Sequence, residues 1–208
     1  MKKSLKKIYY FFDKIYSYFY IKWKLKKLQK LNLKIKIIIG ASSTKYKGWI
    51  KTNFYSLNLL KISTFENFFN FNEIDTILIE HVLEHLTKEE AKLAMNNCYK
   101  YLKKDGFIRI AVPDGNFKNQ KYLDSVKPGG TGPGAKDHKV LYNFETIQHI
   151  FNTEIYTLRY LEYFDNDGNF IQNHWKKEDG FVQRSKDYDW RNKNGLNYTS
   201  LIVDAIKN

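Results

Sequence analysis

Three apolar segments of the chain each end at a small or a polar residue. The segments are Leu33 to Ile39 before Gly40, Ile74 to Ile79 before Glu80 and His81, and Phe107 to Val112 before Pro113 and Asp114. Nearly continuous apolar runs of this length are typical of strands that are buried on both faces, as in a parallel sheet.

A helix is predicted between the second and the third of these segments. Thr87-Lys-Glu-Glu90 forms a capping box, in which Thr87 is the N-cap and Glu90 reaches back to it. The helix that it opens runs to about Lys103 and ends at the turn signal Asp105-Gly106. This strand–helix–strand order predicts a parallel sheet.

Further elements are expected on both sides of this unit. They are strands at 49–54, 57–62, 154–164 and 198–206, a short helix at 143–151 and a hairpin-type turn at 165–168. The last strands follow turns and loops without a crossover helix, which indicates an antiparallel edge. We therefore expect residues 33–208 to form one α/β domain with a doubly wound sheet.

Residues 1–32 form a separate basic amphipathic arm in this prediction. Apolar side chains recur there at steps of three and four and would form one stripe on a helix, with lysines opposite. The stripe consists of Leu5, Ile8, Tyr9, Phe12, Ile15, Tyr16, Phe19 and Trp23. Such a helix suits an anionic membrane surface, packing on the body or on a second copy of the chain, or nucleic-acid phosphates. Its longest charge-free run, 15–21, is too short for a membrane span of ~20 residues, and no secretory signal is evident.

The net charge of +13 comes mainly from this arm. Residues 1–36 carry twelve lysines and one aspartate, so the remaining 172 residues carry only +2. A nearly neutral body argues against nucleic acid as the main partner. The single cysteine, Cys98, excludes an intramolecular disulfide and is expected in the core. We expect a cytoplasmic protein that is peripheral at the inner membrane face.

The strand ends carry the first candidates for chemistry, because ligands of open α/β sheets lie beyond the carboxyl ends of strands. Glu80, His81 and Asp114 stand at such ends. Gly40 and Ala41 end the first strand with small residues that let a ligand approach the backbone closely. The dinucleotide fingerprint G-x-G-x-x-G is missing, and an ordinary tight turn is the alternative.

Histidines supply two further candidate features. His81-Val-Leu-Glu84-His85 matches the metal-binding spacing H-x-x-E-H. His81 belongs to a strand end, however, and no further ligand cluster is obvious, so we expect no metal site and an inward-packed His85. His138 follows the glycine-rich stretch 128–134, and an imidazole, with its ordinary pKa of ~6.5, on such a lid-like loop suits a general base.

A polar segment before the last strand offers contacts to an acceptor. Arg184 and Arg191 could bind a phosphate or a carboxylate, and Trp190 could stack on a ring. Asp137, next to His138, is a further substrate-binding candidate. The alternative for the segment is a solvated surface loop.

Five segments together resemble a family of predicted class I S-adenosylmethionine-dependent methyltransferases, which often occurs among bacterial surface-polysaccharide genes. The segments are 40–53, 80–86, 109–115, 128–139 and 197–204. The resemblance extends over about residues 35–207. It implies a Rossmann-like seven-stranded sheet with the last strand antiparallel, and S-adenosylmethionine as the cofactor.

The resemblance also assigns residues to the cofactor by position. These are Gly40 and Ala41 at its methionine part, Asn53 at the ribose, Asn58 and Leu59 beside the adenine, and Glu80 and His81 at the sulfonium. Asn53 stands where an aspartate usually bonds the ribose hydroxyls, and Asn58 also replaces an acid. An amide can bond a hydroxyl but lacks the charge of a carboxylate.

These features predict methyl transfer to an oxygen or nitrogen of a small polar, phosphate-bearing or sugar-type metabolite in surface-glycan biosynthesis. His138 is expected as the general base and His81 as a positioning residue, with Asp114 as a competing base. Two alternatives remain. One is a non-catalytic scaffold at the membrane, which the two amides and the arm would favour, and the other is an RNA methyltransferase with phosphates on the arm.

Overall fold

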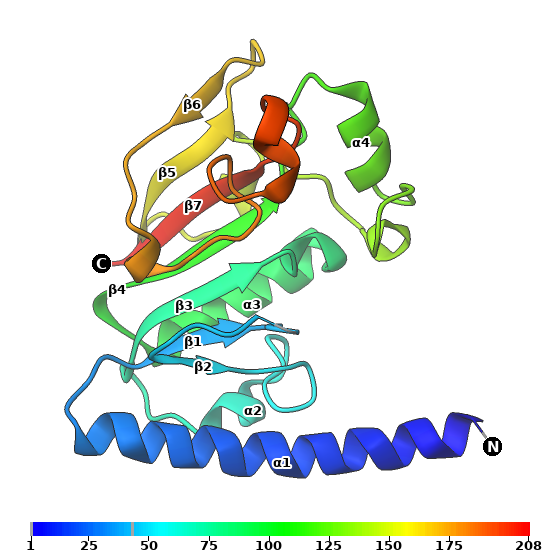
Figure 1. The fold of residues 1–208 in the computed structure, drawn as a ribbon. Coiled ribbons are helices and arrows are strands. Elements are labelled where there is room, and N and C mark those ends of the chain that lie inside the picture. The colour runs from blue at the N-terminus through cyan, green and yellow to red at the C-terminus, as the bar shows by residue number, and fades with distance from the viewer. Residues whose placement is uncertain (1, 43) are drawn as a thin grey trace.

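The computed structural model describes residues 2–42 and 44–208, the first eight of them by their backbone only. They form a seven-stranded mixed sheet in the order β2-β1-β3-β4-β7-β5-β6 (Figure 1). The strands are β1 (Lys36–Ile39), β2 (Trp49–Lys51), β3 (Ile74–Glu80), β4 (Leu102–Pro113), β5 (Tyr156–Phe164), β6 (Phe170–Gln172) and β7 (Ser200–Lys207). Strands β1 to β4 are parallel, and β7 lies antiparallel between β4 and β5. The predicted Rossmann-like sheet with an antiparallel last strand is confirmed.

The described residues also form four α-helices and five short 3-10 helices, of which α1 precedes the first strand and the others lie between strands. They are α1 (Lys2–Lys30), α2 (Ile62–Glu66), α3 (Lys88–Tyr101), α4 (Gln120–Val126), η1 (Leu83–His85), η2 (Ala135–Asp137), η3 (Ile147–Ile150), η4 (Lys177–Asp179) and η5 (Trp190–Asn194). The predicted capping box opens α3, because the Thr87 hydroxyl accepts from Glu90 N and the Glu90 carboxylate accepts from Thr87 N. Cys98 is buried on this helix as expected, and burial raises the pKa of its thiol.

The strand expected at 57–62 is wrong. Oδ1 of Asn58 accepts from Leu60 N at 2.9 Å, which makes a local turn, and α2 follows directly. Such side-chain-to-backbone bonds compete with strand pairing. The seventh strand is instead β6, which pairs with β5 after the predicted turn at 165–168, where Gly168 has φ +78°. The helix expected at 143–151 is reduced to the single 3-10 turn η3.

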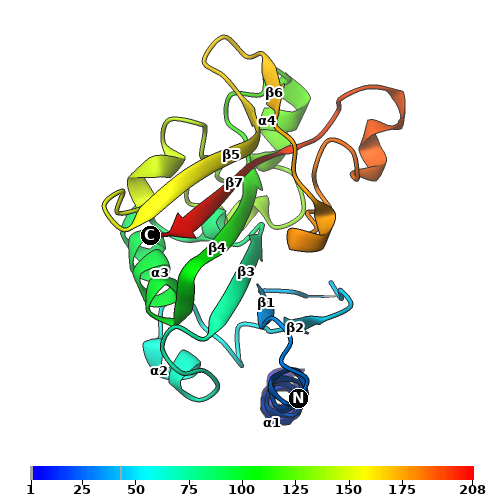
Figure 2. The same ribbon diagram turned by 90° about the vertical axis from the view of Figure 1, so that its left-hand side faces the viewer.

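The two faces of the sheet are covered differently (Figure 2). One face packs against α2, α3 and the C-terminal half of α1 in the main hydrophobic core. The other face is covered by the segment 173–197, whose Val182 packs on strand residues such as Leu78 and Ile202. This segment also contributes to the cavity described below.

A buried ion pair fixes segment 173–197 to the sheet. The Arg109 guanidinium donates two parallel hydrogen bonds to the Asp204 carboxylate, at 2.7 and 2.8 Å. Its third nitrogen donates to the carbonyl of Gly180 at 2.8 Å. Bidentate arginine–carboxylate pairs are strong and directional. The pair therefore fixes the orientation of the guanidinium, which in turn holds the backbone at Gly180 against β4 and β7.

Helix α1 packs with a different face from the predicted stripe. Ile21, Leu25 and Leu28 are buried in the main core. All five members of the stripe whose side chains are described are exposed, namely Phe12, Ile15, Tyr16, Phe19 and Trp23; the side chains of Leu5, Ile8 and Tyr9 lie outside the described ones. The division into an arm (1–32) and a domain (33–208) stays a prediction, but α1 contributes to the core of the domain. No helix within residues 2–42 and 44–208 is both long and apolar enough to span a bilayer.

Candidate active site

A cavity of about 420 Å³ lies beyond the carboxyl ends of β1 and β3. Its walls come from the residues after β1, the turn after β3, the segment 125–138 and the segment 183–198. The sheet order brings the first two together, because β1 and β3 are neighbours. This is the edge of the sheet at which the sequence predicted a ligand.

Gly40 forms the end of β1 and part of the cavity wall. It has φ +68°, in the left-handed region that favours glycine. A Cβ atom on Gly40 would stand 2.7 Å from Cγ2 of Val82, in the turn after β3. The next residue, Ala41, donates its N–H to Thr52 O at 2.9 Å and so joins the ends of β1 and β2. A glycine is therefore favoured at position 40, because a side chain there would collide with the turn after β3.

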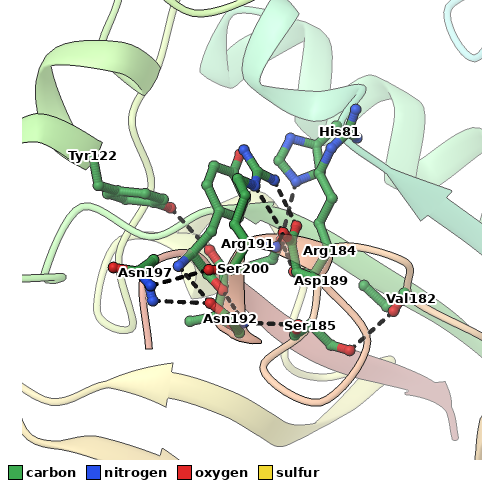
Figure 3. Close-up of polar contacts among 12 residues, drawn as sticks. His81, Tyr122, Val182, Arg184, Ser185, Asp189, Arg191, Asn192, Asn197 and Ser200 are labelled. Carbon is green, nitrogen blue, oxygen red and sulfur yellow. Dashed lines mark hydrogen bonds and ion pairs between the residues drawn. The ribbon is translucent and has the colours of Figure 1, made fainter. Parts of the chain in front are cut away.

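His81 is held in a strained backbone conformation at the end of β3. Its φ is +53°, which is rare for a residue with a side chain and persists where the surroundings over-determine it. Nε2 of His81 lies 3.0 Å from the Ser200 hydroxyl, which donates to Arg184 O at 2.8 Å (Figure 3). Nδ1 lies 3.0 Å from Oε1 of Glu84. The ring is thus fixed from both sides.

Glu84 is a buried carboxylate among three imidazoles. Burial opposes its ionisation, but the charge of His81, a hydrogen bond from the same ring and, more weakly, the charge of His85 hold the pKa of Glu84 below its ordinary value. Nε2 of His138 lies 3.9 Å from Oε1 of Glu84. The Glu84 carbonyl accepts from Lys139 N at 2.7 Å, which ties the chain after the glycine-rich loop to the turn after β3.

The segment 183–198 closes the opposite wall. Arg184 N donates to the Glu80 carboxylate at 2.9 Å. The Arg191 guanidinium lies 3.3 Å above the centre of the Tyr198 ring. It also pairs with the Asp189 carboxylate (Figure 3). Burial raises the pKa of Tyr198 to about 12, so its hydroxyl stays protonated near neutral pH.

The structure brings together about half of the predicted site residues. Those that line the cavity are Gly40, Ala41, Glu80, His81, His138, Arg184 and Arg191. Those that do not are Asn53, Asn58, Leu59, Asp114, Asp137 and Trp190. Trp190 is 74% exposed and Asp137 is also exposed.

Asp114, a predicted alternative base, is fully buried away from the cavity. Its two carboxylate oxygens accept the N–H groups of Asn116 at 2.9 Å and Phe164 at 2.8 Å. Burial raises the pKa of Asp114 to about 6, although these two hydrogen bonds favour the charged form. The contacts are those of a residue that joins the end of β4 to the end of β5.

At the end of β2, the amide of Asn53 is engaged with α1. Its Nδ2 donates to Asp13 at 2.7 Å and to Ser17 at 3.2 Å, while its Oδ1 accepts from the N–H groups of residues 55 and 56. Asn58 bonds within its own turn, and Leu59 is buried in the core. Asn53 replaces an expected aspartate at this strand end, but a carboxylate is nevertheless close by, because Asp13 of α1 bonds the Asn53 amide.

Sequence patterns did not single out Ser200 and Tyr198 as site residues, and they pointed to Glu84 and His85 only weakly. His85 lies in the cavity wall, half-buried, with its ring centre 4.7 Å from that of His138. The spacing H-x-x-E-H was the one signal for it. The proximity of His138, which lies 53 residues further along the chain, has no local signature.

Comparisons with known proteins find similar folds and no related sequence. No protein-family model matches the chain, and no curated protein matches it. A SAM-dependent methyltransferase structure from Archaeoglobus fulgidus aligns with a TM-score of 0.48 and 11% identity over 90% of this chain and 93% of that one. One from Thermotoga maritima gives 0.42 and 11% over 98% and 94%, and one from Methanosarcina mazei gives 0.42 and 9% over 87% and 84%. At this distance the similarity carries no conclusion about the reaction.

Proposed function

We propose that this protein transfers a methyl group from S-adenosylmethionine to an oxygen or nitrogen of a small polar, phosphate-bearing or sugar-type acceptor in surface-glycan biosynthesis. The observation that carries the proposal is the cavity at the ends of β1 and β3. Gly40 and Glu80 line one part of it, and histidines line another. The resemblance of five sequence segments to class I methyltransferases supports the same cofactor, whose sulfonium supplies an electrophilic methyl group when it is bound.

The residues at the ends of β1 and β3 fit the methionine part of this cofactor. Gly40 and Ala41 present backbone with small side chains, and Glu80 offers a carboxylate that is already oriented by Arg184 N. At the end of β2, Asn53 and Asp13 form an amide–carboxylate pair that can bond two hydroxyls of a ribose. Binding there requires the hydrogen bond between these two side chains to be exchanged for bonds to the ligand.

Two arginines favour an anionic acceptor. Arg184 and Arg191 line the cavity. Arg191 is already paired with Asp189, whereas no carboxylate among the described residues pairs with the Arg184 guanidinium. An unpaired guanidinium at the wall of a cavity suits a phosphate or a carboxylate of the acceptor.

His138 is the proposed general base. Its Nδ1 lies 2.6 Å from Val126 O, and since a carbonyl only accepts, Nδ1 carries the hydrogen. Nε2 is then left with its lone pair, next to Glu84, and can take the proton of an acceptor hydroxyl. His81, fixed between Ser200 and Glu84, acts as a positioning residue.

We also infer that α1 holds the protein at an anionic membrane surface, and that nucleic acid is not a main partner. The exposed Phe12, Tyr16, Phe19 and Trp23 share this helix with many lysines, and the rest of the chain is nearly neutral. Self-association through the same stripe is the other outcome. A non-catalytic scaffold is the second candidate function, because the amide at the ribose position is already engaged by Asp13 and Ser17.

Calorimetric titration with S-adenosylhomocysteine tests the cofactor and separates the two candidates. The wild-type chain should bind it, and Gly40→Val should not, because the added side chain collides with Val82 and distorts the ends of β1 and β3. A folded wild-type chain that does not bind would leave the scaffold function. Unchanged affinity in folded Gly40→Val would remove this site.

A screen of nucleotide-sugars and phosphorylated metabolites with labelled cofactor then identifies the acceptor. With it, His138→Gln should lower kcat by roughly 10²–10⁴-fold, the usual contribution of a general base, and should leave the affinity for S-adenosylhomocysteine unchanged. His149→Gln, at an exposed histidine in η3, is the matched control. Near-normal turnover in His138→Gln would transfer the role to His81.

A further inference from the structure

Within the described part of the chain, Glu84, His85 and His138 form a group of metal-ligand type. One ligand atom from each residue lies within 4.8 Å of the other two. Two residues come from the turn after β3 and the third from the end of the glycine-rich loop. All three line the cavity.

Among the described residues, the Glu84 carboxylate has one close partner for its buried charge, the ring of His81. Its side chain is 1% exposed, and Oε2 has no hydrogen-bond partner among the described residues. Nδ1 of His81 stands 3.0 Å away, close enough for charge attraction. Burying a carboxylate with so few hydrogen bonds is costly, and a bound cation is one of the few further compensations.

His138 is oriented as a metal ligand usually is. Metal-bound imidazoles almost always donate their second ring N–H to a carbonyl or a carboxylate, which fixes the ring and its tautomer. Nδ1 of His138 makes this contact with Val126 O at 2.6 Å, and the side chain is only 6% exposed. The unprotonated Nε2 therefore points to Glu84 from a ring that is already held in place.

We propose that Glu84, His85 and His138 bind a divalent transition-metal ion of the Zn²⁺ class. Two imidazoles and one carboxylate match the ligands of zinc sites that keep an open coordination position. Bond lengths of about 2.0–2.2 Å bring tetrahedral ligands about 3.4 Å apart. The ligand atoms now lie within 4.8 Å of one another, so closing the group would require a side-chain rotation, which we assign to His85 as the least buried of the three. His81 is not a ligand here but orients Glu84.

Because the three residues line the cavity, an ion bound there would be able to hold an oxygen of the acceptor; this consequence, unlike the ion binding itself, rests on the proposed function. An ion on Nε2 of His138 takes the lone pair that would otherwise accept a proton. In the loaded protein His138 would therefore be a ligand, and the ion would lower the pKa of an oxygen bound to it. A measurement of turnover with and without the metal distinguishes the two roles of His138. Turnover that requires the metal indicates a ligand, and turnover without it indicates a general base.

The test is a Zn²⁺ titration of the tag-free, full-length chain after treatment with a chelator and dialysis, without cofactor. The chain has five histidines, and His149 and His174, exposed and outside the group, supply the control. Wild type and the His149→Gln/His174→Gln variant should each bind one ion with equal affinity. His85→Gln and His138→Gln should each bind at least tenfold more weakly. Co²⁺ should give visible absorption bands that His85→Gln loses.

Circular dichroism of each variant shows whether it is folded, and His85→Gln, at the less buried position, keeps the test valid if His138→Gln unfolds. Absence of stoichiometric binding to the wild type would overturn the proposal, as would equal affinity in His85→Gln and wild type. Zn²⁺ binding without binding of S-adenosylhomocysteine would refute the proposed function and leave the metal site standing. The reverse result would refute the metal site alone.

Discussion

Helix α1 is predicted to contribute to the stability of the whole domain through one of its faces only. Ile21→Ala removes a side chain that is 0% exposed and lies in the main core. Phe19→Ala, two positions earlier on the same helix, removes a larger side chain that is 65% exposed. If the helix packs in solution as in the structure, the smaller deletion should be the more damaging one.

The size of the difference follows from the burial of the two side chains. Truncating a fully buried isoleucine to alanine costs about 2–5 kcal/mol, in lost transfer free energy and in the cavity that remains. The higher helix propensity of alanine returns a few tenths of a kcal/mol. We expect Ile21→Ala to lower the free energy of unfolding by about 3 kcal/mol, and Phe19→Ala to change it by no more than about 0.5 kcal/mol.

Urea unfolding followed by circular dichroism measures both variants. With a slope of about 3 kcal/mol/M, a loss of about 3 kcal/mol lowers the midpoint by about 1 M. Phe19→Ala should leave the midpoint within about 0.2 M of that of the wild type. Equal and small changes in the two variants would refute the packing of α1 on the body. The helix would then be a detached arm, as the sequence alone suggested.

Two further predictions concern the exposed stripe and Asp114. Phe19→Ala and Trp23→Ala should weaken sedimentation with anionic vesicles without loss of stability; a full-length chain that ignores such vesicles but dimerises would assign the stripe to self-association. Burial raises the pKa of Asp114 to about 6 in the folded state. Between pH ~4 and ~6, Asp114 is therefore protonated in the folded chain and ionised in the unfolded chain. As the pH rises through that window, the contribution of this group to the free energy of unfolding falls by about 3 kcal/mol. Asp114→Asn should flatten this part of the stability–pH curve, and a curve parallel to that of the wild type would contradict the assignment.

The sequence predicted those parts of the fold that rest on local signals. The apolar runs ending at Gly40, Glu80 and Pro113 became β1, β3 and β4, and the capping box at Thr87 opens α3. Both signals depend on residues that are close in sequence. An apolar run is recognised from consecutive residues, and the first N–H groups of a helix are hydrogen-bonded by side chains of the same turn. The prediction of a strand at 57–62 was wrong because it considered only the apolar residues. Asn58 forms a local turn through its side chain, and the apolar pattern carries no information about that turn.

The candidate site was predictable only where it coincides with strand ends. Gly40 and His81 line the cavity because β1 and β3 are adjacent parallel strands. Asp114 also follows a strand, yet its carboxylate is buried and accepts hydrogen bonds from the N–H groups of Asn116 and Phe164. A pattern along the chain identifies the end of a strand, but it does not say whether the side chain there meets solvent or another loop.

The two interpretations of α1, packing and surface binding, exclude each other only if they use the same face. In the structure they do not. Ile21 is buried against the domain, while Phe19 and Trp23, its neighbours at i−2 and i+2, are exposed. Residues two positions apart on a helix do not face each other, so both faces can be occupied at once. Since Asp13 on the packed side also bonds Asn53 at the end of β2, the helix that would meet the membrane also contacts the strand end at which we propose that the ribose of the cofactor binds.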